Sequence, residues 1–324
     1  MMRRDMAMRR RGLVAWALTV LLACGAGGCG GGEGGKEVAL RTPVAVLHDV
    51  ERDVYLVSSL GASRDRSAKD NDGAIVRVSP ETQRTTAWIE GGVNGVELHA
   101  PCGMALADDG SLWVADIDAL RCFDAKTGAL RRSVALPEAG ALHDVAVAPD
   151  GAVYVSDRGR VAGGGSGAAA VPGAIWRLRP DGEVSLLTRG DVLGEPTGIV
   201  ARPAALYVVG FAEGSFYQVD YRGVRTPLGE APQPGLLGLV RAGAPAQASV
   251  PPPRGALDQK SPMPLPAWLA CSATANAVYR FAMQGGAGAL PLRVAEPGVP
   301  AWDSGRGVLV VPCLTENRLS VERL

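Results

Sequence analysis

Three side chains near the middle of this 324-residue chain could support nucleophilic or metal chemistry. Cys102, His143 and Asp144 supply a thiol, an imidazole and a carboxylate, a set that forms activated thiolates in some enzymes and transition-metal sites in other proteins. The same residues also have an ordinary structural interpretation. In that interpretation Cys102 fills apolar space, and His143 and Asp144 make hydrogen bonds at the end of a strand.

Further polar residues follow a spacing that relates them to this group. Thr197 lies in a later copy of the segment that contains His143, and Asp116, Asp157 and Arg158 end neighbouring apolar segments. We therefore expect these side chains to gather at one face of the fold. The candidates for acid–base catalysis are His143, Asp144, Asp116 and Asp157, and the candidates for ligand binding are Cys102, His143, Asp144, Arg158 and Thr197.

The elements that would position these residues are short strands that repeat six times. Val54–Val57 and Val153–Ser156 represent one recurring strand, and Val76–Val78 and Trp176–Leu178 represent a second. Asp-Gly pairs such as Asp150-Gly151 separate the strands, as in tight hairpins. Units of about 48 residues match the blades of known propellers. The chain is therefore predicted to be all-β, a six-bladed β-propeller of antiparallel sheets around one axis.

Two further features of the ring are predicted. The sixth unit reaches Leu324 with its third strand, so Glu37–Arg41 is expected to complete the last blade and close the ring. Gly61–Gly73 and Arg158–Gly173 are insertions expected to overhang the face where the inner strands begin, which we call the mouth. Ala242–Pro266 is expected on the opposite face.

The repeats resemble a known family. Pro101–Leu106, Leu142–Gly151 and Pro196–Ile199 resemble inner strands of the gluconolactonase family, which includes regucalcin (senescence marker protein) and luciferin-regenerating enzyme. The resemblance runs from about residue 40 to the C-terminus and extends to NHL-repeat propellers. Val308–Leu324 resembles the ends of exported, uncharacterised members. The resemblance implies a propeller that hydrolyses lactones or esters with one divalent cation on the axis.

The positions that would hold this cation carry unusual residues. By the resemblance, the family's ligand positions are occupied by Val44, His143, Thr197 and Leu237. Calcium-like cations bind several oxygen atoms, and valine and leucine side chains offer none. We therefore expect a degenerate metal site and no bound cofactor. Calcium, manganese or zinc belongs only to the alternative in which hydrolysis is retained.

Three functions remain open from the sequence. The first is a non-catalytic binding module for a small molecule or an envelope protein, the second is a gluconolactonase-like hydrolase, and the third is a structural protein-interaction propeller. The 33 basic and 33 acidic side chains balance, which argues against nucleic-acid binding. A disulfide between Cys271 and Cys313 is also left open.

The N-terminal residues predict export. Residues 1–23 combine a basic start with a short apolar run and read as a lipoprotein signal peptide. Leu21-Leu22-Ala23-Cys24 resembles a lipobox, which makes Cys24 the expected lipidation site. Residues 24–36 are a glycine-rich tether, and residues 37–324 form the propeller. The chain is thus expected in the bacterial cell envelope, held to a membrane by lipid alone, on the periplasmic face or the outer membrane.

Overall fold

The computed structural model describes residues 35–160, 169–243, 266–282 and 287–324. The predicted signal peptide, Cys24 and nearly all of the predicted tether lie outside these residues. No helix among the described residues is long and apolar enough to cross a membrane.

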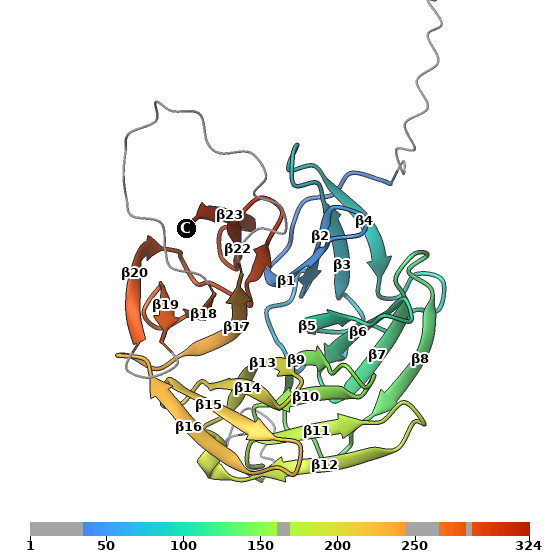
Figure 1. Ribbon diagram of the computed structural model, residues 1–324. Helices are drawn as coiled ribbons and strands as arrows, with labels where there is room; N and C mark the ends of the chain where they lie inside the picture. The colour runs from blue at the N-terminus through green and yellow to red at the C-terminus, as the bar shows by residue number, and fades with distance from the viewer. Residues whose placement is uncertain (1–34, 161–168, 244–265, 283–286) are drawn as a thin grey trace, which may run out of the picture. The chain divides into compact units, whose positions relative to one another are not determined.

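The described chain forms six antiparallel sheets, in each of which the strands pair in chain order (Figure 1). Blades 1 and 2 consist of β1 (Pro43–Asp49), β2 (Val54–Ser59), β3 (Ala74–Val78) and β4 (Thr85–Glu90), and of β5 (Pro101–Leu106), β6 (Ser111–Asp116), β7 (Ala119–Asp124) and β8 (Leu130–Ala135). Blades 3 and 4 consist of β9 (Leu142–Val147), β10 (Val153–Asp157), β11 (Ala174–Leu178) and β12 (Val184–Arg189), and of β13 (Pro196–Arg202), β14 (Ala205–Gly210), β15 (Ser215–Asp220) and β16 (Arg225–Glu230). Blades 5 and 6 consist of β17 (Leu236–Ala242), β18 (Ala267–Ser272), β19 (Ala277–Phe281) and β20 (Ala287–Arg293), and of β21 (Ala301–Asp303), β22 (Val308–Cys313) and β23 (Arg318–Arg323). A short 3-10 helix, η1 (Asp191–Leu193), precedes β13.

The sheets stand side by side in a ring, with the first strand of each blade on the axis (Figure 1). The predicted six-bladed β-propeller is therefore confirmed. Apolar side chains of adjacent blades meet between the sheets, as where Tyr207 of blade 4 stacks on Trp268 of blade 5 with ring centroids 4.5 Å apart. Burial of these interfaces removes apolar area from water and holds each blade against the next. Gly110 and Gly151 take positive φ in the hairpins that connect the first two strands of blades 2 and 3, as the Asp-Gly pairs predict.

The closure of the ring differs from the prediction. Glu37 bridges Thr86, and the Val38 amide donates to the Thr85 carbonyl, so the predicted strand Glu37–Arg41 begins beside the outer strand of blade 1 and does not complete blade 6. The free edge of β4 offers unpaired backbone groups, and Val38 packs on the core between blades 1 and 6. The ring closes at the axis instead, where the Val46 amide donates to the Val299 carbonyl. Figure 1 shows β1 in blue beside β22 in red.

The three insertions connect the strands that the sequence predicts. Residues 60–73 follow β2 and residues 158–173 follow β10, so both leave the ring at the mouth, where the inner strands begin. β17 ends at the opposite face, and residues 244–265, which make up most of the third insertion, lie outside the described part of the chain. Cys271 and Cys313 are both buried free thiols, so the disulfide left open by the sequence does not form.

Candidate functional site

Five buried side chains hold corresponding positions at the mouth end of the inner strands, each the second residue of its strand. They are Val44, Cys102, His143, Thr197 and Leu237, and none is more than 6% exposed. We call these five residues the plug.

Glycines next to the plug bring neighbouring inner strands into close contact. A Cβ atom on Gly103 would lie 2.6 Å from the Asp144 Cα, and one on Gly238 would lie 2.7 Å from the Val299 Cα. Real Cβ atoms do not approach other carbons so closely, so only glycine allows this spacing. The inner strands therefore meet almost backbone to backbone beside the plug.

His143 is buried in the plug without a hydrogen-bond partner. Neither ring nitrogen has a partner in the described part of the chain, although the residue is only 2% exposed. Burial lowers the pKa of His143 well below its usual value, and the positive charges of Arg66 and Arg158 lower it further. The imidazole is therefore neutral at physiological pH, with one donor and one acceptor unused.

Cys102 lies beside an arginine rather than a base. Arg66, on the insertion after β2, places its Nη1 atom 3.5 Å from the Cys102 Sγ atom. Burial raises the pKa of the Cys102 thiol, and the nearby Arg66 only partly offsets this. Because the imidazole of His143 makes no hydrogen bond to this thiol, the arrangement is not that of an activated thiolate pair.

Asp144 faces away from His143, across the gap between two inner strands. Its Oδ1 atom accepts from the Val145 amide at 2.9 Å, and its Oδ2 atom accepts from the Ile199 amide of blade 4 at 3.1 Å. Burial raises the pKa of Asp144 to about 7, against the opposing effect of these two amides. The carboxyl thus links blades 3 and 4, and no Lys or Arg of the described residues contacts it.

Asp116 and Asp157 hold the loops that lead into the inner strands. Asp116 accepts from the backbone amides of His99 and Ala100 and from Arg121. Asp157 accepts from the amides of residues 140, 141 and 159 and from the indole of Trp176. Both carboxylates are fully buried, so their acceptor capacity serves to position the mouth.

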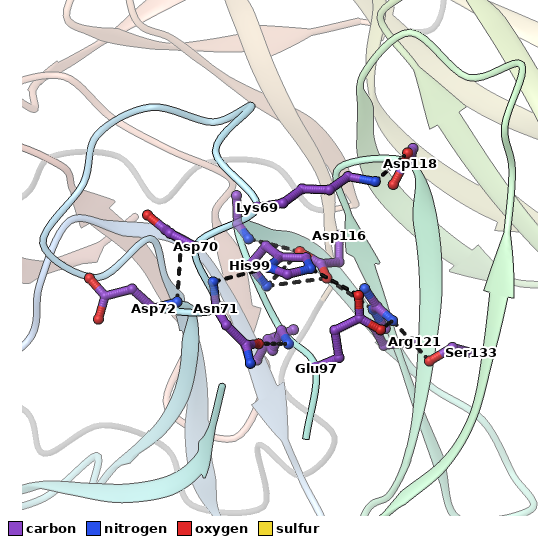
Figure 2. Close-up of polar contacts among 12 residues, drawn as sticks. Lys69, Asp70, Asn71, Asp72, Glu97, His99, Asp116, Asp118, Arg121 and Ser133 are labelled. Carbon is purple, nitrogen blue, oxygen red and sulfur yellow. Dashed lines mark hydrogen bonds and ion pairs between the residues drawn. The ribbon is translucent and has the colours of Figure 1, made fainter. Parts of the chain in front are cut away.

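A polar network attaches the insertion after β2 to blade 2 (Figure 2). The backbone N–H of Asn71 donates to Nδ1 of His99. The Nε2 atom of His99 contacts the Glu97 carboxylate, which also accepts a hydrogen bond from Arg121. Lys69 makes an ion pair with Asp118 at 2.8 Å. These contacts fix the part of the insertion that follows Arg66.

The remaining two candidates are also engaged in contacts. The hydroxyl of Thr197 donates a hydrogen bond to the Leu236 carbonyl at 2.8 Å and so links blade 4 to blade 5. Arg158 pairs with Glu195 at 2.7 Å and lies over the ring of Phe211. The backbone N–H of Arg158 donates to the Ala141 carbonyl. This bond holds the guanidinium charge of Arg158 near His143.

The side chains at the mouth bring few oxygen donors. Val44 and Leu237 bring only carbon, the hydroxyl proton of Thr197 is directed at backbone carbonyls, and the charges nearest His143 are positive. Among the described residues, no three His, Cys, Asp or Glu side chains converge as metal ligands. Calcium-like ions bind several oxygen atoms at fixed distances, so the scarcity of side-chain oxygen bears on the function proposed below.

Solved structures show the same architecture. A gluconolactonase from Xanthomonas campestris aligns with a TM-score of 0.60 at 15% identity, covering 87% of this chain and 86% of that one. Regucalcin from Agrobacterium tumefaciens, described as a calcium-binding protein, aligns at 0.56 and 15%, covering 86% and 83%. Virginiamycin B lyase from Staphylococcus aureus aligns at 0.54 and 13%, covering 89% and 98%. No protein-family model and no curated protein matches the sequence.

The predicted resemblance to gluconolactonase and regucalcin is thus confirmed at the level of the fold. Sequence reasoning correctly assigned Cys102, His143 and Thr197 to equivalent strand positions, but it missed Arg66. Its signal was weak, because Arg66 lies in an insertion rather than in a strand that recurs in the other repeats. The spacing between Asp65 and Lys69 gives no indication that Arg66 turns inward.

Proposed function

We propose that this chain is a binding propeller that takes a small anionic molecule at its mouth without a resident divalent cation. The observation that carries the proposal is the reversal of charge around the plug. Where similar folds are expected to offer oxygen ligands to a cation, this chain has Val44 and Leu237, with Arg66 and Arg158 close to an uncharged His143.

The two arginines differ in what they offer a ligand. Arg66 contacts the Cys102 sulfur and makes no ion pair with a carboxylate of the described residues. A guanidinium that lacks an acidic partner binds carboxylate or phosphate oxygens in a bidentate manner. Arg158 already pairs with Glu195, so it would act on a ligand mainly through its positive electrostatic potential rather than through direct hydrogen bonds.

Calorimetric titration with citrate and with inorganic phosphate, at constant ionic strength, tests the proposal. We expect saturable binding of at least one of these anions and a loss of at least tenfold in Arg66→Gln, the size expected for one charge-assisted hydrogen bond. Arg179→Gln is the matched control, because Arg179 forms an exposed ion pair with Glu183 in the hairpin between β11 and β12 of blade 3. Equal affinity in both variants would contradict an anion site at the mouth.

The hydrolase alternative has its own assay. A panel of lactones and esters is offered to the chain with added calcium, manganese or zinc. Turnover that requires the cation and disappears in His143→Ala and Asp144→Ala would replace the binding proposal with gluconolactonase-like catalysis. Co-purification of one envelope protein at fixed stoichiometry, without anion binding, would favour a structural role.

We also propose that the propeller is exported and anchored through lipid on Cys24. The basic and apolar segments before Leu21-Leu22-Ala23-Cys24 support this placement. Growth with labelled palmitate should label the chain, and Cys24→Ser should abolish labelling and release the protein from the membrane fraction. Cys29→Ser, five residues further on, is the control and should leave labelling intact.

A further inference from the structure

A cavity of about 360 Å³ occupies the axis on the other side of the plug. Residues of all six inner strands line it, including Met104, Val145, Ile199 and Leu239, and none of the five plug residues does. The cavity extends toward the face opposite the mouth, where His48 and Trp302 contribute to its wall. A volume of this size accommodates a compact organic ligand.

The wall of the cavity contains one carboxyl group, that of Asp144. Each of its oxygen atoms accepts a single backbone amide, at 2.9 Å from Val145 and at 3.1 Å from Ile199. A carboxylate has about four acceptor sites, so part of its capacity is unused. A buried charge is costly unless it is paired, and no Lys or Arg of the described residues contacts Asp144.

The missing partner has a definite chemistry. An ammonium group carries one positive charge and only hydrogen-bond donors, which complements a carboxylate. The other cavity side chains are mostly aliphatic and suit a hydrocarbon body, while the free inner edges of the strands offer backbone carbonyls to further donors. A calcium-like ion would instead need about six to eight oxygen ligands, of which the side chains of the wall supply only the two oxygen atoms of Asp144.

We propose that the axial cavity binds a small organic ammonium ion, with its nitrogen at the Asp144 carboxylate and its hydrocarbon body against Val145, Ile199 and Leu239. The ligand enters from the face opposite the mouth, so this site and the anion site at the mouth are separate. Trp302 at the outer end gives the ligand an aromatic surface.

The strength of this pairing depends on pH. Because burial raises the pKa of Asp144 to about 7, the carboxylate form that attracts the ligand grows between pH 6 and pH 8. The titratable neighbours are the Cys102 thiol on β5, His143 on β9 and His48 on β1. The cavity residues of β13 and β17, and those of the segment entering β21, carry no titratable side chain. Asp144 is the one carboxyl among these groups, so loss of the pH dependence in Asp144→Asn would assign the change in affinity to it rather than to His48.

Calorimetry on the full chain with cyclohexylammonium chloride tests the proposal. The amine keeps its charge at both pH values, like a lysine side chain. We expect binding at one site, about tenfold tighter at pH 8 than at pH 6, in proportion to the ionised fraction of Asp144. Cyclohexanol and cyclohexanecarboxylate match the amine in shape and should bind at least tenfold more weakly, because neither pairs with a carboxylate.

Two variants and one spectroscopic measurement make the test decisive. Asp144→Asn should lose the pH dependence, and Asp150→Asn, in the exposed hairpin of the same blade, should retain it. Carboxyl-carbon NMR of the wild-type protein, which needs no variant to fold, should show the Asp144 pKa fall when the amine is added. Equal affinity for amine and alcohol, unchanged binding in Asp144→Asn, or no binding at all would overturn the proposal.

Discussion

Replacement of Arg121 by methionine tests how the mouth is held in place. Arg121 is almost fully buried, and its Nε atom lies 2.9 Å from Asp116, which is 0% exposed. Its Nη1 atom contacts Glu97, whose side chain is 58% exposed (Figure 2). Arg121→Met removes the charge opposite a buried carboxylate while preserving most of the apolar length of the side chain.

The expected loss follows from which partner is buried. Breaking a buried ion pair costs about 3–5 kcal/mol, and Asp116 keeps the amides of His99 and Ala100, so we expect about 3 kcal/mol for Arg121→Met. The exposed contact is worth less than about 1 kcal/mol, so Glu97→Gln should have a small effect. In the double variant Arg121→Met, Asp116→Asn the two losses should not add, with a coupling of about 2 kcal/mol.

Urea unfolding followed by circular dichroism measures these differences, with the slope of the transition serving as a check that the unfolded state is unchanged. Arg179→Met removes the exposed pair with Glu183 and should cost less than about 1 kcal/mol. If Arg121→Met were no more destabilising than Arg179→Met, or if the Arg121 and Asp116 losses added fully, the buried pair would not be what holds the mouth.

Two further predictions concern the axis. Asp144 binds its proton more tightly in the folded chain than in the unfolded chain, so its contribution to stability is full below pH 4 and is lost as the pH rises through 7. Urea unfolding should therefore show the wild type losing a few kcal/mol of stability relative to Asp144→Asn between pH 5 and pH 8, and the same pH dependence in both proteins would exclude the raised pKa. Gly238→Ala should destabilise by at least about 2 kcal/mol, because its Cβ would meet Val299 at 2.7 Å. Gly288→Ala, where nothing lies within 4 Å of the added Cβ atom, should be nearly neutral. Thermal melts compare the two variants, and equal effects would contradict close packing at the axis.

The sequence predicts the blades well because each repeat carries its own signals. Alternating apolar residues and Asp-Gly turns such as Asp150-Gly151 act over a few residues, so the strands and hairpins can be derived locally. The closure of the ring cannot be derived in this way. Whether Glu37–Arg41 pairs with blade 1 or blade 6 depends on which edge is nearer in space, and both edges offer the same backbone groups.

The candidate site is predictable in position but not in chemistry. The repeat register places Cys102 and His143 at equivalent points, yet it does not reveal that Arg66 reaches Cys102 from an insertion. Nor does it reveal that the side chains of two adjacent residues lie in different places, His143 in the plug and Asp144 in the wall of the axial cavity. Strand alternation separates successive side chains, but which side is open depends on the packing of all six blades.

The most direct test of the central claim is a titration of the chelator-treated chain with calcium, manganese and zinc, followed by calorimetry. With Val44 and Leu237 in the plug and Arg66 nearby, we expect no saturable binding of any of the three ions at the mouth. Binding at one site that is lost in His143→Ala, with a matching rise in thermal stability on addition of the ion, would contradict the account.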